Sequence, residues 1–480
     1  MFVGTGSDVG KSIIAAGFCR VLKQDGFNPA PFKAQNMSLN SFVTPEGLEI
    51  GRAQAVQAEA CGIPCKSSMN PVLLKPTSEK SSQIILHGKP IGNQTANDYF
   101  LGNNKENLFK EAQNAFDSLA DEYHPIVMEG AGSISELNLK HRDIVNMRMA
   151  KYANACVYLI ADIDKGGVFA SVYGTIALLE DWERELVKGI IVNKFRGDIN
   201  LFETGRTKIE ELTGIPVIGV VPYASDIYIE DEDSVALSQK NEMAVAEKIN
   251  IAVVLLPHIS NYTDFNLLER DDRVNLFYSN KAEEIEKADI IILPGTKNTI
   301  ADLQFLRVNG IAKSVLKAFD TNKKVIGICG GYQMMGEEVS DPFGVESDSN
   351  TIPGLGIIPM KTTLTKEKTT IQREFKFKNL EGKCSGYEIH MGTSITDKSS
   401  PLLQINDIKE GYLLNDNCWG SYMHGIFDNQ VVIDDLLGSV SKNEVKSYEE
   451  FKDENFNKLA DLLRDCLDIE KMYSQTIIAE

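Results

Sequence analysis

The feature that most constrains this chain is a glycine-rich turn near its start. The segment GTGSDVGKS, from Gly4 to Ser12, follows the apolar residue Val3 and precedes a helical stretch with an apolar stripe, IIAAGFCRVLKQDG. A turn of this kind presents backbone N–H groups to phosphate at a helix N-terminus. It predicts an α/β domain whose first strand is short, or whose start is truncated, because only three residues precede the turn.

Within the turn, Lys11 is placed to reach the outer phosphates of a nucleotide and Ser12 to bind magnesium. The usual spacing has glycine five residues before the Gly-Lys pair, where this chain has Thr5. The alternative is a tight turn with a surface lysine, but Gly10, Lys11 and Ser12 together at a helix start favour phosphate binding. The ATP-binding residues predicted in the turn are Thr5, Gly6, Asp8, Gly10, Lys11 and Ser12.

This form of the loop resembles the dethiobiotin synthetase branch of nucleotide-binding proteins. The related partition and septum-placing ATPases carry a second lysine five residues before the loop lysine, where this chain has Gly6. The departure speaks against a dimerising ATPase switch. The resemblance also implies that Asn193 and Lys194, at the end of GIIVNKF, lie near adenine; the alternative is a plain loop entrance.

A carboxylate downstream completes the predicted nucleotide site. Glu129 stands at the end of an apolar strand, in HPIVMEGAGS, just before a glycine-rich turn. At that place it can hold Mg²⁺, or its water, opposite the Ser12 hydroxyl. The alternative is a solvated glutamate at a strand end.

The apolar segments divide the chain into two α/β units. Segments 157–163, 189–195 and 216–223 are rich in β-branched residues, and the pattern restarts at 249–257, 288–295 and 323–331 after a polar, acidic stretch at 225–250. This rhythm predicts two parallel sheets wrapped by helices. We expect an ATP-binding synthetase domain over 1–240, a second α/β domain over 248–440 and a helical tail over 441–480, whose amphipathic helix caps the second domain.

Composition limits the partners of the chain. The formal net charge of −19 over 480 residues argues against nucleic acid or an anionic membrane as partner. The eight cysteines are scattered without paired zinc-site spacing. We see neither a signal peptide nor an apolar run of ~18 residues, so a cytoplasmic protein with reduced thiols is expected.

The second unit carries a cysteine at a sharp corner. In VIGICGGYQMMG a buried strand breaks at glycines into a helix, with Cys329 between Ile328 and Gly330. Such a turn exposes the sulfur, favours its thiolate at a helix N-terminus and lets the Gly330 N–H bind an oxyanion. An ordinary buried cysteine is the alternative, and the glycines on both sides disfavour it.

A thiolate nucleophile needs a base, and His424 in SYMHGIF follows an apolar run 95 residues later. These residues resemble the class I glutamine amidotransferase domain, which implies a flavodoxin-like amidotransferase domain over 248–440. It also implies that Gly295 in LPGTKNT supplies a second oxyanion N–H. Most such domains carry glutamate two residues after the histidine, where this chain has Ile426. The group that orients His424 is therefore unidentified from the sequence.

The segment GYEIHMG also resembles a branch of these domains, the cobyrinate-amidating one, which shares the missing glutamate. By this resemblance Tyr387, Glu388 and His390 line the glutamine pocket. His390 competes with His424 for the role of base.

Nearly the whole chain resembles the cobyric acid synthase family, at FKAQNMSLNS, GRAQAVQAEA, MNPVLLKP, EGAGSISELNL, DIDKGGVFAS, NKFRGD, LPGTKNT and GICGGYQ. The resemblance implies ATP- and glutamine-dependent amidation of the b, d, e and g carboxylates of adenosylcobyrinic acid a,c-diamide in cobalamin biosynthesis. Lys33, Arg52 and Lys75 are candidates to face this corrin polycarboxylate, and an exposed surface role is the alternative for each.

Two other functions compete with this one. Cobyrinic acid a,c-diamide synthase shares both domain types and amidates two other carboxylates. A nucleotide switch with an inactive amidotransferase module is the second alternative; Cys329 at its corner and the missing second lysine weigh against it.

Overall fold

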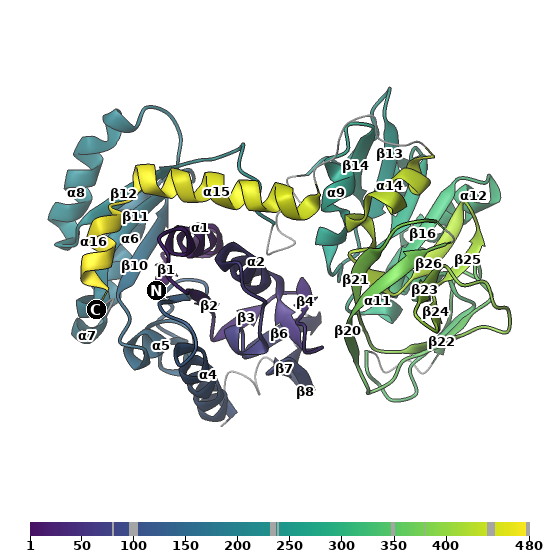
Figure 1. The fold of residues 1–480 in the computed structure, drawn as a ribbon, viewed down its shortest axis with the longest axis horizontal. Helices are drawn as coiled ribbons and strands as arrows, with labels where there is room; N and C mark the ends of the chain where they lie inside the picture. The colour runs from purple at the N-terminus through teal and green to yellow at the C-terminus, as the bar shows by residue number, and fades with distance from the viewer. Residues whose placement is uncertain are drawn as a thin grey trace.

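The computed structural model describes residues 1–78, 81–95, 104–230, 237, 240–346, 351–378, 380–438 and 447–476. Figure 1 shows two α/β lobes with a long helix running across them. The predicted fold class, two successive α/β domains, is confirmed. Part of the acidic segment between them and the start of the predicted tail lie outside the described residues.

The first domain is built on a parallel sheet. Its strands run in the order β1-β10-β11-β12, and β2 pairs with β9, which a bridge between Phe2 and Glu129 joins to β1. Strand β1 has three residues, in agreement with the short strand predicted before the glycine-rich turn. The strands are β1 (Phe2–Gly4), β2 (Ala30–Phe32), β9 (Ile126–Met128), β10 (Val157–Asp162), β11 (Val187–Phe195) and β12 (Val217–Pro222).

Helices cover this sheet, and a smaller strand group extends the domain toward the second lobe (Figure 1). The helices are α1 (Lys11–Gln24), α2 (Arg52–Cys61), α4 (Asn104–Ala120), α5 (Met147–Tyr152), α6 (Val168–Leu178), α7 (Asp181–Leu186) and α8 (Glu203–Thr213). The small strands are β3 (Gln35–Met37), β4 (Ser41–Val43), β5 (Glu49–Gly51), β6 (Val72–Ser78), β7 (Ser81–Leu86) and β8 (Lys89–Thr95). Strands β4 and β5 form an antiparallel hairpin.

The second domain has a six-stranded sheet in the order β14-β13-β15-β16-β26-β25, parallel except for β25. These strands are β13 (Ile249–Val254), β14 (Val274–Ser279), β15 (Ile290–Leu293), β16 (Lys324–Ile328), β25 (Tyr412–Asn415) and β26 (Cys418–Ser421). Its helices are α9 (Asn266–Glu269), α10 (Ala282–Ile285), α11 (Thr299–Val308), α12 (Ile311–Asp320), α13 (Gly330–Met335) and α14 (Gln430–Leu437). All six strands predicted from apolar segments are present in the two domains.

Two further sheets cover one end of the second domain. One has the order β24-β23-β20-β21-β27 and the other β18-β17-β19-β22. The first contains β20 (Thr369–Phe377), β21 (Cys384–His390), β23 (Leu403–Ile405), β24 (Ile408–Glu410) and β27 (Met423–His424). The second contains β17 (Glu338–Ser340), β18 (Thr351–Pro353), β19 (Lys361–Thr363) and β22 (Thr393–Ile395).

The C-terminal helices differ from the prediction. Helix α15 (Tyr448–Cys466) leaves the second lobe and lies along α1, and α16 (Ile469–Gln475) follows on the first domain (Figure 1). The apolar side chains of α15, Phe456, Leu459 and Leu463, are buried in a core shared with α1. The amphipathic helix therefore caps the first domain and not the second, because its apolar stripe packs on α1.

Among the described residues, no helix combines the length and apolar character that crossing a bilayer requires.

Replacing Leu463 with alanine tests where α15 packs. The side chain is fully buried against α1, and a Cβ added at Gly17 would lie 2.5 Å from Leu463 Cδ1. Leu463→Ala should lower the unfolding free energy of the first domain by about 2–5 kcal/mol, through lost burial and the cavity left behind. Urea unfolding monitored by Trp182 fluorescence in a Trp419→Phe background measures this. The exposed Asp461→Ala is the control, and equal stability of the two variants would contradict the packing.

Candidate active sites

The glycine-rich turn forms a loop between β1 and α1. Gly10 has φ +96°, and a Cβ at this position would lie 2.1 Å from Asn193 Nδ2, so a side chain there would strain the backbone and displace the Asn193 amide. The Asn193 amide in turn donates to the Val9 carbonyl at 2.8 Å. Asn193 thus braces the loop from the end of β11, a contact that the sequence did not predict.

Both lysines of the site contact the loop backbone. Lys11 Nζ donates to the carbonyls of Gly6 at 2.9 Å and Gly132 at 3.1 Å. Lys194 Nζ donates to the Asp8 carbonyl and pairs with Asp162, 3.0 Å away. The predicted residues of this site therefore converge on one loop, with the two ammonium groups beside it.

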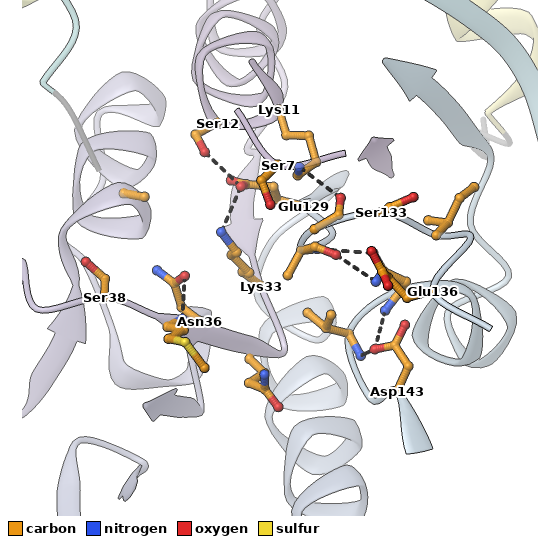
Figure 2. Close-up of a pocket in the computed structure, with 18 of the residues that line it drawn as sticks. Ser7, Lys11, Ser12, Lys33, Asn36, Ser38, Glu129, Ser133, Glu136 and Asp143 are labelled. Carbon is orange, nitrogen blue, oxygen red and sulfur yellow. Dashed lines mark hydrogen bonds and ion pairs between the residues drawn. The ribbon is translucent and has the colours of Figure 1, made fainter. Parts of the chain in front are cut away.

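Glu129 lies at the centre of a buried polar cluster (Figure 2). Its Oε1 accepts hydrogen bonds from Ser12 Oγ at 2.8 Å and Lys33 Nζ at 2.9 Å, and its Oε2 from Gln57 Nε2 at 2.6 Å. Its side chain has no exposed surface. A carboxylate and a hydroxyl this close are the oxygen donors that Mg²⁺ takes together with nucleotide phosphates. The donor set fits that ion.

A cavity of about 1090 Å³ opens in front of the loop. Ser7, Asp8, Gly10, Lys11, Ser12, Lys33, Glu129 and Lys194 line it, and Figure 2 shows several of these side chains around one space. Tyr262 of the second domain contributes to its wall. The cavity also contains cations that the sequence did not single out: Lys105, Lys140, Arg142 and Arg148.

Two of the three candidate corrin-facing cations do not line the large cavity. Arg52 is absent from the cavity lining, pairs with Glu230 and is about 5% exposed. Lys75 is also absent from it, and its ammonium pairs with Glu49 at 2.7 Å. Of the three, only Lys33 lines the large cavity. The sequence identified cationic residues but could not show which carboxylates they pair with.

The strand-to-helix corner at Cys329 has the geometry of a nucleophile elbow. Cys329 follows β16 directly, has φ +50° and ψ −109°, and is the N-cap of α13. A positive φ in a non-glycine residue is strained and is typical of catalytic corners. The N–H of Gly330 is the first of the helix and has no acceptor within it. Gly295 lies opposite, where a Cβ would come within 2.9 Å of His424 Cε1.

His424 is buried between the cysteine and an aspartate. Its Nδ1 lies 2.7 Å from Asp264 Oδ2, and Asp264 Oδ1 also accepts the N–H of Gly425 at 2.9 Å. Burial lowers the pKa of His424, but the Asp264 carboxylate, the Cys329 sulfur and hydrogen bonds to both raise it to about 10. A cationic imidazole beside Cys329 favours the thiolate.

Asp264 therefore occupies the place of the orienting group that the sequence left open. It lies in the η5 turn (Tyr262–Phe265), 160 residues before the histidine. Its signal in the sequence is its place shortly after the first strand of the second domain, in SNYTDF, but spacing alone does not connect it with His424.

The three residues predicted for the glutamine pocket have different surroundings. Only His390 lines the small cavity that contains Cys329. It stacks on Tyr422 at 3.8 Å, and its Nε2 lies 3.3 Å from Glu388, which also pairs with Arg373. Tyr387 stacks on the His424 ring at 5.4 Å. The histidine with the Asp264 partner is thus His424, not His390.

The β4–β5 hairpin of the first domain packs on the second domain beside His424. Asn261 Nδ2 donates to the Ser41 carbonyl and to Tyr387 Oη, each at 2.8 Å. Phe42 meets the Tyr387 ring edge-on at 4.9 Å. The two sites are therefore connected through direct contacts between the domains.

The fold and the two sites define an amidotransferase: a nucleotide-binding domain joined to a glutamine amidotransferase domain. Residues 1–235 match the CobQ/CobB/MinD/ParA nucleotide binding domain, and residues 250–432 match the CobB/CobQ-like glutamine amidotransferase domain. A solved glutamine amidotransferase structure is also similar, with 16% identity and a TM-score of 0.29 over 44% of this chain and 98% of that one.

Curated relatives match over nearly their whole length. The cobyric acid synthase of Parabacteroides distasonis is 58% identical over 99% of this chain and 98% of its own. Those of Bacteroides fragilis and Lachnoclostridium phytofermentans are 55% and 46% identical, over 98% of this chain and 97% and 98% of their own. The chain belongs to the cobyric acid synthase family. It is a glutamine-hydrolysing ligase with a nucleotide-binding domain.

Asp264→Asn tests the orienting role. Asparagine fills the same space but loses the charge that raises the pKa of His424, so glutaminase kcat should fall by roughly 10²- to 10⁴-fold. Because the pKa of the imidazolium drops, the alkaline fall of the pH–rate profile should move to lower pH. Asp434→Asn, at a carboxylate paired with Arg273 in the same domain, is the control. An unshifted profile with normal kcat would exclude the role.

Proposed function

We propose that this protein amidates the b, d, e and g carboxylates of adenosylcobyrinic acid a,c-diamide, with one ATP and one glutamine for each, in cobalamin biosynthesis. The observation that supports this most directly is the joining of two sites. A Cys329, His424 and Asp264 arrangement lies in one domain and a phosphate loop facing a large cavity in the other. Ammonia released at the first is then consumed at the second.

In the glutaminase step, the Cys329 thiolate attacks the side-chain amide carbon of glutamine. The N–H groups of Gly330 and Gly295 stabilise the oxyanion. His424 gives its proton to the departing ammonia, and Asp264 keeps the imidazolium oriented. Water then hydrolyses the glutamyl thioester and releases glutamate.

In the synthetase step, a substrate carboxylate oxygen attacks the γ-phosphorus of ATP, and ADP leaves. Ammonia attacks the resulting acyl phosphate carbon, and inorganic phosphate departs to leave the amide. Lys11 stabilises the transferring phosphoryl group, and the loop N–H groups hold the neighbouring phosphates.

Ser12 and Glu129 are the residues that would hold Mg²⁺. The ion would neutralise charge on the nucleotide phosphates as the phosphoryl group transfers. The Glu129 carboxylate is also paired with the Lys33 ammonium at 2.9 Å.

The large cavity is our candidate for the corrin site. Its volume of about 1090 Å³ exceeds what a nucleotide alone needs, and its wall includes Lys105, Arg142 and Arg148, cations able to face carboxylates. Burial lowers the pKa of Lys105 to about 8, which leaves it mostly charged at neutral pH.

Cobyrinic acid a,c-diamide synthase chemistry differs from the proposed reaction only in which carboxylates react. Mass spectrometry of the corrin product distinguishes the two, because each amidation changes the mass by about one unit and the proposed reaction adds four amides.

Cys329→Ser should abolish glutamine-dependent synthesis and spare synthesis from ammonium salts, because the cysteine serves only to release ammonia. His424→Ala should behave in the same way. Product formation with glutamine or ammonium chloride measures both, with Cys384→Ser, a buried cysteine of the same domain, as control. Equal loss of both activities in Cys329→Ser would refute the role, and loss in His390→Ala but not His424→Ala would reassign the base.

Lys11→Ala should lose amidation from either nitrogen source while leaving the cysteine site intact. Loss of such a charge contact with the transition state costs on the order of 3 to 4 kcal/mol, or about a hundredfold or more in rate. The assay is ammonia-dependent amidation at saturating ATP and magnesium, with the exposed Lys23→Ala on the same helix as control. Ammonia-dependent amidation near the parent rate would mean that the loop is not the synthetase site.

A further inference from the structure

Lysines from both domains meet beside the glutaminase cysteine. The small cavity containing Cys329 is lined by Lys297 and Lys368 of the second domain and by Lys75 of the first. Lys75 lies on β6, Lys297 follows β15, and Lys368 directly precedes β20. A single buried pocket thus contains three ammonium groups, although glutamine chemistry at the cysteine itself requires none.

The carboxylates around these lysines do not balance their charge. Glu49, on the β4–β5 hairpin, pairs with both Lys75 and Lys368, and its side chain has no exposed surface. One carboxylate therefore serves two ammonium groups, whose side chains are 5% and 6% exposed. Among the residues that the structure describes, Lys297 makes no ion pair.

The remaining carboxylate of the cavity is already engaged. Glu346 accepts the backbone N–H of Thr299 at 2.6 Å, at the start of α11. Burial raises its pKa to about 7, which lowers the negative charge that it can offer to Lys297. The pocket therefore has an excess of positive charge close to neutral pH.

The pKa values of the lysines reflect the same imbalance. Burial lowers the pKa of Lys368 to about 7, and repulsion from Lys75 and Lys297 acts in the same direction against the attraction of Glu49. Burial and repulsion from Lys75 also lower the pKa of Lys297. An anion entering among the three would relieve this repulsion.

Glutamine brings such an anion. Its α-carboxylate is only a few bonds from the side-chain amide carbon that Cys329 attacks, and the three lysines line the cavity at this cysteine. We propose that Lys75, together with Lys297 and Lys368, binds the α-carboxylate of glutamine, so that the glutamine site is complete only when the two domains are docked. This inference rests on the proposed glutaminase role of Cys329.

Strand β6 connects the cysteine cavity with the large cavity of the first domain. Lys75 lines the cysteine cavity, while the next residue, Pro76, lines the large cavity of the first domain. Successive side chains of a strand point to opposite faces, so β6 is a shared wall. A shift of β6 as the large cavity fills would move an ammonium group of the glutamine site.

The test is Lys75→Met, which keeps the side-chain length and removes the charge. It should raise KM for glutamine by about tenfold to a hundredfold, the cost of a lost charge-assisted contact. The second measurement compares glutamine with 4-aminobutanamide, which lacks the α-carboxylate. The ratio of their kcat/KM values for ammonia release should fall by a similar factor. Lys66→Met, at an exposed ion pair with Glu122, is the matched control.

Unchanged KM for glutamine, or equal loss of kcat/KM with both amides, would overturn the proposal, since a merely structural lysine would affect both donors alike. If Lys75→Met does not fold, Lys297→Met is tested by the same two measurements, KM for glutamine and the preference for glutamine over 4-aminobutanamide. Failure of the underlying glutaminase assignment looks different: Cys329→Ser would then retain ammonia release in the otherwise unaltered protein.

Discussion

The two sites depend on the docking of the β4–β5 hairpin against the second domain. Its backbone accepts a hydrogen bond from Asn261, its Phe42 ring packs on Tyr387, and its Glu49 is shared between lysines of both domains. A buried carboxylate is tolerated only when it is paired, so Glu49 requires both partners in place. The burial of one charge thereby fixes the relative position of two catalytic domains.

The sequence predicted those parts that local chemistry determines. The phosphate loop, Glu129 and the corner at Cys329 each depend on residues adjacent in the chain, where glycine or a strand end leaves few possible conformations. The six apolar segments also became strands, because burial on both faces of a parallel sheet requires continuous apolar runs.

The parts that could not be predicted depend on contacts between distant residues. Asp264 and His424 are 160 residues apart, and no spacing rule connects them. Arg52 and Lys75 were candidates to face the corrin because their partners, Glu230 and Glu49, become neighbours only in the folded protein. Helix α15 had the expected amphipathic pattern, but a stripe of apolar residues does not specify which surface covers it.

The return of α15 and α16 to the first domain makes the second domain an insertion within the first. Side chains such as Leu463 and Met472 complete a core that begins with Phe2 and Ile14. During synthesis the ribosome releases these last residues only after the whole amidotransferase domain has emerged. The amidotransferase domain can therefore fold as soon as it is made, whereas the nucleotide-binding domain must wait until α15 and α16 have emerged to close its core.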